Sequence, residues 1–98
     1  MKYFLVVHPA AAAEFDEAAI WYENQRPGLG ILFVEKVQMA LDTILNNPVR
    51  FAFADSNLRE APVSKFPFCI YFRINQNRIA ILSIFHTSRN PSIWQSRK

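Results

Sequence analysis

The chain has little of what several protein classes depend on. Among its 98 residues it has two glycines and one cysteine, Cys69, so an intrachain disulfide is excluded and no cysteine-based metal site is available. Its unbroken apolar runs are only a few residues long, too short to cross a bilayer, and the N-terminus lacks the layout of a signal peptide. We therefore expect a cytoplasmic protein without a membrane span, in which Cys69 is a small buried side chain.

Motifs for several kinds of chemistry are missing too. The sequence has no glycine-rich phosphate loop, no histidines and acids at metal-ligand spacing and no helix-turn-helix pattern. Its late serines lack a recognisable base partner, so a serine nucleophile has little support. We expect neither a metal nor a cofactor.

The composition is that of a folded domain with an uneven charge distribution. Apolar residues make up 51% and charged residues 19%, which favours one globular domain spanning residues 1–98. Residues 1–49 carry six acids and three bases, whereas residues 50–98 carry two acids and eight bases. This split favours a negatively charged partner for the second half, nucleic acid or an acidic protein segment. Arginines that merely solvate a strand-rich surface would give the same balance.

Residue patterns predict an α+β domain with the order β-α-α-β-β-β. Runs of β-branched and aromatic residues predict strands at residues 2–7, 58–63, 66–74 and 79–85. Apolar residues at three- and four-residue spacing predict helices at 10–25 and 31–46, separated by Pro27-Gly28. The short connection predicts an antiparallel αα-hairpin packed on one face of a small antiparallel sheet.

The last two predicted strands form a hairpin whose register decides which side chains share a face. If Ile74 pairs with Ile79, one face is almost wholly apolar and needs the helices as its cover. That face would hold Phe68, Ile70, Phe72, Ile74, Ile79, Ile81 and Phe85. The opposite, mixed face would hold Cys69, Tyr71, Arg73, Ala80, Leu82, Ile84 and His86.

Three residues of the basic half could form a reactive centre on the mixed face. Arg59, Arg73 and His86 are of the types that hold a scissile phosphate, with arginines stabilising charge and the histidine acting as general acid or base. The alternative is that the arginines pair with nearby acids or lie along the sheet.

The tail beyond the last strand adds three more candidate groups. Arg89, Trp94 and Arg97 are of the types that bind anions or stack on bases and side chains. Trp94 could instead fold back as a packing plug, the interpretation we favour for that residue alone. On the first helix, Trp21 and Ile20 widen the apolar surface beyond one stripe, which indicates either burial or a docking surface.

In its order of motifs, the chain resembles the RelE/ParE superfamily of toxins over nearly its whole length. The residues that carry the resemblance are Glu17 to Glu23, Pro27 to Gly30, Phe33, Val37, Ala40-Leu41, Asn47-Pro48, Arg59, Phe66 to Phe68, Ile70-Tyr71 and the closing His86-x-x-Arg89-x-Pro91-x-x-Trp94-x-x-Arg97.

This resemblance implies the toxin half of a bacterial type II toxin–antitoxin module, of the kind also called plasmid stabilisation proteins. The implied partner is a small ParD- or RelB-like antitoxin that wraps an extended or helical segment around the toxin. The apolar surface of the first helix suits such a partner, so we expect Phe15, Trp21 and Tyr22 to bind the antitoxin.

The resemblance leaves two targets open. RelE-like toxins cut mRNA on the ribosome, whereas ParE-like toxins inhibit DNA gyrase without being nucleases. The helical hairpin favours the ParE-like branch, as does the lack of nuclease lysines near the second predicted strand, where only Lys65 is present.

Our leading hypothesis is therefore a protein-binding toxin that uses the basic surface, with Arg89, Trp94 and Arg97 contacting the target. The alternative is a ribosome-dependent endoribonuclease with Arg59, Arg73 and His86 as catalytic residues, so we leave open whether the chain is an enzyme. A third possibility is a domesticated binding module without toxicity.

Overall fold

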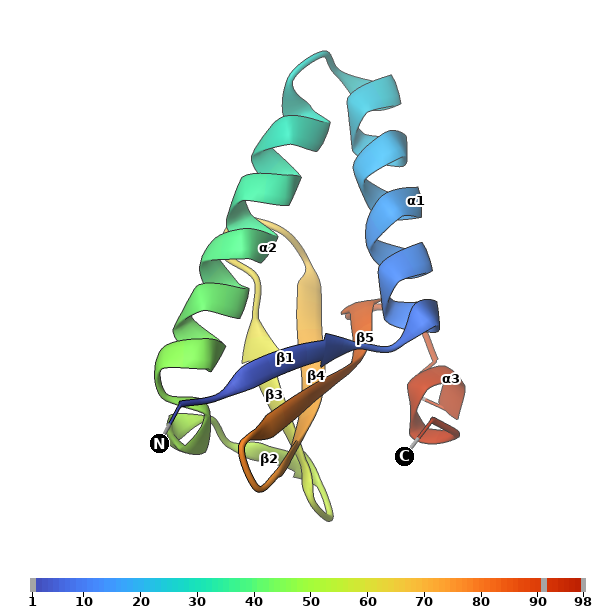
Figure 1. Ribbon diagram of the computed structural model, residues 1–98. Coiled ribbons are helices and arrows are strands. Elements are labelled where there is room, and N and C mark those ends of the chain that lie inside the picture. Colours follow the sequence, from blue (N-terminus) through green and yellow to red (C-terminus); the bar gives the residue numbers. More distant parts are fainter. Residues whose placement is uncertain (1, 91, 98) are drawn as a thin grey trace.

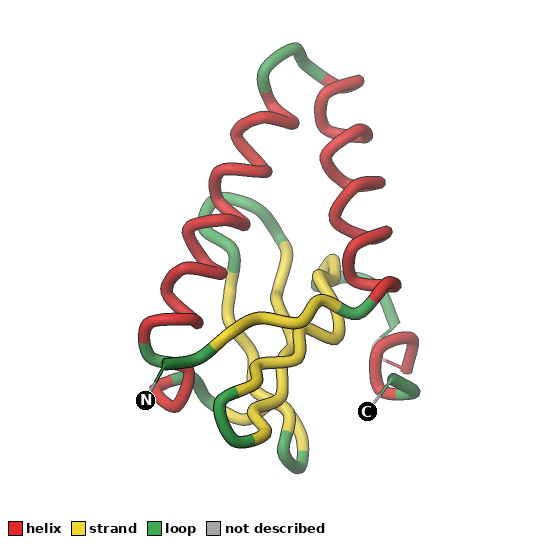
Figure 2. The backbone as a smooth tube through the Cα atoms, in the orientation of Figure 1, coloured by secondary structure: helices red, strands yellow, loops and turns green. Residues whose placement is uncertain are grey.

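In the computed structural model, which describes residues 2–90 and 92–97, a pair of helices lies over one face of a five-stranded sheet (Figures 1 and 2). The elements in chain order are β1 (Phe4–Val7), α1 (Pro9–Gln25), α2 (Leu29–Asn46), the 3-10 turn η1 (Pro48–Arg50), β2 (Phe53–Asp55), β3 (Leu58–Pro62), β4 (Phe68–Asn75), β5 (Arg78–His86) and α3 (Ser92–Gln95). The α+β class and the helical hairpin are confirmed, and β2 and α3 are additional elements. Pro91, one of the residues that carry the resemblance, lies outside the described residues.

The sheet is mixed, so the prediction of an antiparallel sheet is wrong for one strand. The strand order is β1-β5-β4-β3-β2, and β1 runs parallel to β5 while the other neighbours are antiparallel. Two helices follow β1, so no hairpin turn fixes its direction, and it pairs with the last strand of the chain. Within the described residues, no helix is long and apolar enough to cross a membrane.

The main core fills the space between the helices and the sheet. At its centre is Phe33 of α2, whose side chain is fully buried. The centroid of its ring lies 5.2 Å from Tyr22, 5.2 Å from Phe66 and 4.9 Å from Phe68. Such edge-on and tilted aromatic contacts add stability beyond the burial of area, and they tie both helices to the start of β4.

A β-bulge in β5 changes which side chains face the helices. Ile74 pairs with Ile79 as predicted, but Tyr71 pairs with Ser83 while Phe72 pairs with Ile81. Leu82 is therefore an extra residue, and beyond it each β5 side chain lies on the face opposite to the predicted one. As a result Ile84 joins the helix-facing core and Phe85 joins a second cluster on the back of the sheet.

The second cluster lies under the C-terminal tail. Leu58, Leu82 and Phe85 on the sheet are covered by Trp94 of α3. The tail thus shields part of the back of the sheet, the face that the helices leave open.

The tip of the helical hairpin is closed by one carboxylate. Glu23 accepts a hydrogen bond from the Gly28 N–H through Oε2 and one from the Gly30 N–H through Oε1, both at 2.9 Å. These N–H groups stand at the start of α2, where helical backbone donors lack partners and negative charge is favourable. Gly28 has a φ of 90°, which explains why the predicted Pro-Gly reversal needs a glycine there.

Replacing Gly30 by alanine is expected to lower the free energy of unfolding by about 2 kcal/mol. A Cβ atom on Gly30 would lie 2.5 Å from the backbone oxygen of Ala19 and 2.8 Å from the Cβ of Glu23, so α1 and α2 would have to move apart. Gly28→Ala is the matched control, because a Cβ there meets nothing within 4 Å and only the positive φ disfavours it, by about 1 kcal/mol. In urea denaturation, Gly30→Ala should lose more unfolding free energy than Gly28→Ala, and equal losses in the two variants would contradict this prediction.

The Glu23 contact should make the hairpin sensitive to acid. The N–H of Gly28, followed by that of Gly30, lowers the pKa of the Glu23 carboxyl. A carboxyl whose pKa is lower in the folded state stabilises the protein above its unfolded pKa, and this contribution disappears as the pH falls through the folded pKa. The stability difference between wild type and Glu23→Gln should therefore shrink from about pH 7 to about pH 3. A stability difference that stays constant over that pH range would show that the charge of Glu23 does not contribute to stability.

Candidate functional site

Arg59 of β3 contacts the segment that precedes it in the chain, from η1 to β2. Its Nη1 donates hydrogen bonds to the carbonyl oxygens of Val49 at 3.1 Å and Phe51 at 2.7 Å. Its guanidinium lies 4.0 Å from the centre of the Phe53 ring, within range of a cation–π contact. Arg59 thus anchors η1 and β2 to β3.

The predicted reactive centre does not form, because its three members lie apart. Arg59 pairs with Phe72 on the helix-facing side of the sheet, and Arg73, the next residue of β4, points to the other face. His86 pairs with Phe68, four residues along β4 from Phe72 and so about 13 Å away along the strand. The predicted convergence of Arg59, Arg73 and His86 on one face is therefore wrong, and the bulge is the reason that His86 changed face.

Two of the three tail residues are used inside the protein. The side chain of Trp94 is only 4% exposed and stacks on Tyr71, with ring centroids 4.0 Å apart. Burial is the main reason that the pKa of Tyr71 rises to about 12. Trp94 is thus the packing plug, and its predicted contact with a target is wrong for this conformation. Arg89 alone of the three is exposed, with its guanidinium 5.7 Å from the centre of the Phe85 ring.

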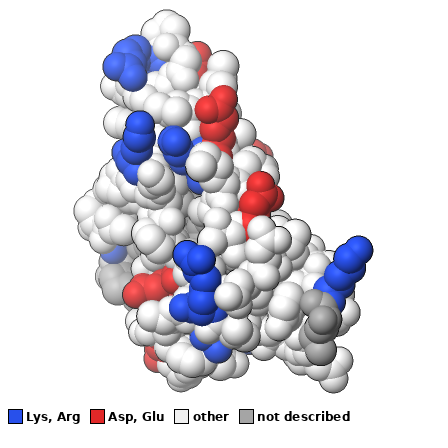
Figure 3. All heavy atoms as spheres, turned by 90° about the vertical axis from the view of Figure 1, so that its left-hand side faces the viewer, with Lys and Arg blue, Asp and Glu red and all other residues white. Residues whose placement is uncertain are grey.

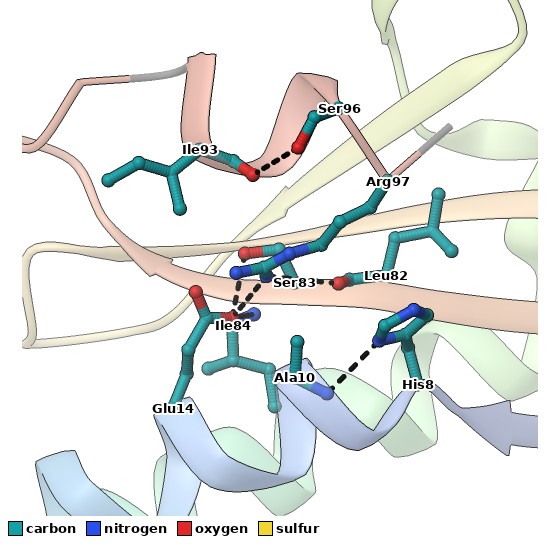
Figure 4. A network of polar contacts seen from close by, with 9 residues as sticks. All are labelled: His8, Ala10, Glu14, Leu82, Ser83, Ile84, Ile93, Ser96 and Arg97. Carbon is teal, nitrogen blue, oxygen red and sulfur yellow. Dashed lines mark hydrogen bonds and ion pairs between the residues drawn. The ribbon is translucent and has the colours of Figure 1, made fainter.

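Arg97 belongs to a polar network around Glu14 that the sequence did not reveal (Figure 4). The Oε1 atom of Glu14 accepts hydrogen bonds from the Ser83 hydroxyl at 2.9 Å and the Ile84 N–H at 3.1 Å, and lies 3.0 Å from Nη1 of Arg97. Arg97 also donates to the Leu82 carbonyl at 3.3 Å. We name these four groups, Glu14, Ser83, the Ile84 amide and Arg97, the Glu14 lock. It joins α1, β5 and the tail just beyond the bulge, so Arg97 is engaged inside the fold.

An open groove of about 620 Å³ runs between α1 and the end of β5. Its lining comes from α1 (Glu14, Glu17, Ala18, Trp21, Tyr22) and from the strands and the turn after β5 (Phe68, Ile84, Phe85, His86, Ser88, Arg89). We call this site the α1 groove.

Trp21 and Tyr22 give the α1 groove an aromatic wall. Trp21 remains 58% exposed although its ring meets Tyr22 edge-on at 5.1 Å. Of the three residues expected to bind an antitoxin, these two line the groove, whereas Phe15 packs against Phe33 in the core with ring centroids 6.0 Å apart. An exposed tryptophan beside a hollow is the kind of surface on which binding hot spots form.

The opposite wall carries polar and positive groups. The ring of His86 rests edge-on against Phe68 at 5.2 Å, and its Nδ1 accepts the Ser88 N–H at 3.2 Å. Since Nδ1 is an acceptor, the neutral ring carries its proton on Nε2, which makes that atom a hydrogen-bond donor. Together with the exposed Arg89, this wall suits carboxylate or carbonyl oxygens of a partner.

Charges of both signs are interspersed on the face shown in Figure 3, which looks onto the α2 side of the molecule. Lysine and arginine atoms there alternate with aspartate and glutamate atoms and do not form a continuous positive field. The charge split seen in the sequence therefore does not produce one basic surface on this side.

The remaining reactive groups are few. Cys69 is buried as predicted, and burial is the main reason that the pKa of its thiol rises to about 11, so the thiolate form is suppressed at neutral pH. Among residues 2–90 and 92–97, no group of three or more histidines, cysteines or acids could hold a metal ion. His8 is the N-cap residue of α1, and its Nδ1 accepts a hydrogen bond from the Ala10 N–H at 3.0 Å (Figure 4).

Comparison with known proteins identifies the family. A solved structure described as "Chromosomal ParDE TA system from P. aeruginosa" superposes with a TM-score of 0.78 at 20% identity, covering 89% of this chain and 98% of that chain. At that identity the likeness shows the fold. None of the curated proteins compared with the chain matches it. The family model described as "ParE toxin of type II toxin-antitoxin system, parDE" matches residues 5–91, so the chain belongs to the ParE family of toxins of type II toxin–antitoxin systems.

Proposed function

We propose that this toxin inhibits growth by binding DNA gyrase rather than by cutting RNA, and that a small antitoxin neutralises it by occupying the α1 groove. The proposal that the toxin does not cut RNA rests on the separation of Arg59, Arg73 and His86. General acid–base cleavage of a phosphodiester needs the proton-transferring group within hydrogen-bond reach of the reacting atoms and a cation at the developing charge. Arg73 lies on the face opposite to His86, and Arg59 lies about 13 Å from His86 along the strand, so neither arginine meets the same phosphate as His86.

The contacts of Arg59 are a second reason to disfavour a nuclease. Its guanidinium already donates to two backbone carbonyls and lies over Phe53. To reach a phosphate beside His86, Arg59 would have to leave these contacts, and the carbonyls of Val49 and Phe51 would lose their donor. A role in binding a protein target does not require that change.

The α1 groove supports the second half of the proposal. Its apolar lining includes Phe68, its aromatic wall carries Tyr22 and the exposed Trp21, and Arg89 and His86 lie on the opposite wall. This arrangement fits an amphipathic segment that places apolar anchors on the floor and oxygen acceptors against Arg89. The α1 wall of the groove also holds Glu14 and Glu17, so a strongly acidic segment would be repelled on that side.

Purified gyrase and relaxed plasmid test the target directly. Increasing amounts of the toxin should block supercoiling or trap cleaved DNA, and prior addition of the antitoxin should restore supercoiling. In a parallel reaction, translating ribosomes treated with the same amount of toxin should keep their mRNA intact. Full supercoiling at saturating toxin, together with mRNA cut in ribosomal A sites, would establish the nuclease instead.

A further inference from the structure

A second concave site lies on the α2 side of the molecule. It encloses about 240 Å³ between α2, the end of η1 and the end of β3. Its walls include Lys36, Met39 and Thr43 of α2, Arg50 and Phe51 at the end of η1, and Pro62 of β3. We call this site the α2 hollow. None of the described residues lines both the α2 hollow and the α1 groove.

The fold holds the η1 wall of the α2 hollow in place. The ring of Phe51 meets the buried Phe72 edge-on, with ring centroids 5.7 Å apart. On either side of Arg50, the carbonyls of Val49 and Phe51 accept hydrogen bonds from Arg59. A site whose walls are fixed before binding loses little conformational freedom when it is filled.

The size and the lining of the α2 hollow suit one apolar side chain. Met39, Phe51 and Pro62 give it an apolar lining, and Met39 is 57% exposed. The hydroxyl of Thr43 already donates to the Met39 carbonyl at 2.9 Å. A volume of about 240 Å³ is smaller than the roughly 300–1,000 Å³ of pockets that enclose a whole small molecule.

A cation lies beside the apolar lining on each side. The ammonium of Lys36 lies 4.0 Å from Sδ of Met39 on the α2 wall, and the guanidinium of Arg50 lies 5.1 Å from the centre of the Phe51 ring on the η1 wall. Lys36 is half-buried and Arg50 is exposed. Acidic groups next to an apolar anchor would therefore meet a positive charge on either side.

A nucleic acid fits this site less well than a protein segment. Glu35 and Asp42 of α2 are exposed, and acids are interspersed with the cations on the side shown in Figure 3. Duplex DNA carries one negative charge per about 1.7 Å, so it would bring phosphates against these acids as well. A short segment can place its few carboxylates at the cations alone.

We propose that the α2 hollow binds a protein segment in which one large apolar residue is flanked by acidic residues. The apolar side chain would enter between Met39 and Phe51, and the carboxylates would meet Lys36 and Arg50. This inference depends neither on gyrase as the target nor on what fills the α1 groove.

A fluorescent peptide with one leucine between two glutamates is the probe for this chemistry. With the full chain, we expect saturable binding in fluorescence anisotropy that weakens with salt. Peptides with serine in place of leucine, or with lysines in place of the glutamates, should bind at least about tenfold more weakly. A serine peptide that binds as tightly as the leucine peptide would overturn the proposal.

Charge reversal tests the two cations. The double variant Lys36→Glu/Arg50→Glu should bind the leucine peptide at least about tenfold more weakly than wild type does. The matched control, Arg26→Glu/Arg78→Glu, changes the net charge equally at two exposed positions outside the hollow and should bind within about threefold of wild type. Equal losses in the two double variants would overturn the proposal, because they would report net charge alone.

A titration followed by NMR locates the peptide. The amide signals of Thr43 and Phe51 should shift on binding, and Met39→Ala should weaken binding more than Ile31→Ala, which changes a 63% exposed residue of the same helix outside the hollow. Binding that leaves both amide signals unmoved would overturn the proposal. So would tighter binding of a short DNA duplex at the same amides, or a dimer that shifts them and excludes the peptide.

Discussion

Glu14→Ala should lower the free energy of unfolding by about 3–5 kcal/mol, the range expected when one partner of a buried ion pair is removed. The side chains of Glu14 and Arg97 are only 13% and 16% exposed. A single oxygen of Glu14 serves the Ser83 hydroxyl, the Ile84 amide and Arg97. Alanine leaves the Ser83 hydroxyl and the Ile84 amide without their acceptor, and leaves Arg97 without its counter-charge, in a place that water reaches poorly.

Two variants make the Glu14 result specific. Glu17→Ala removes an exposed acid from the same helix and should change stability by no more than about 0.5 kcal/mol. A double-mutant cycle with Arg97→Met should give a favourable coupling energy, because the two side chains touch. Additive effects, or a Glu14→Ala protein as stable as wild type in urea denaturation, would show that the Glu14 lock does not hold α1 to β5.

Trp21→Ala should weaken antitoxin binding about 100-fold, as expected for a hot-spot tryptophan. The prediction assumes that the antitoxin fills the α1 groove, where Trp21 forms the rim. Since this side chain is 58% exposed, the substitution should leave the stability of the free toxin nearly unchanged. Titration calorimetry with the purified antitoxin measures the difference.

The next residue along the helix provides the control. Ile20 is 62% exposed but does not line the groove, so Ile20→Ala should retain affinity within about threefold. A loss in Ile20→Ala that matches or exceeds the loss in Trp21→Ala would place the antitoxin on the outer face of the hairpin instead.

Local patterns in the sequence predicted the helical part of the fold well. Apolar spacing located α1 and α2, and the Pro27-Gly28 turn located the reversal between them, because such features depend on neighbours in the chain. The direction of β1 could not be predicted, since β1 pairs with residues more than 70 positions later. The bulge at Leu82 was hidden because residues on both faces of β5 are apolar, so an extra residue leaves no break in the pattern.

The positions of the candidate site residues depend on features of the fold that the sequence patterns did not reveal. One extra residue in β5 moved His86 to the face opposite Arg73, and with it the predicted reactive centre was lost. Arg59 and Arg97 were counted as surface charge, yet backbone carbonyls and Glu14 engage them, and composition alone does not reveal such partners. Ser83 was the available hint, as a lone hydroxyl in an aliphatic strand has to find a buried partner.

Growth of a bacterial culture that expresses the chain alone tests most directly whether this ParE-family protein is an active toxin restrained through its α1 groove. The wild-type chain should arrest growth, and co-expression of the antitoxin should restore it. The Trp21→Ala variant should arrest growth equally but resist rescue. Unimpaired growth while the folded wild-type chain accumulates, or rescue of Trp21→Ala as complete as that of wild type, would contradict this view.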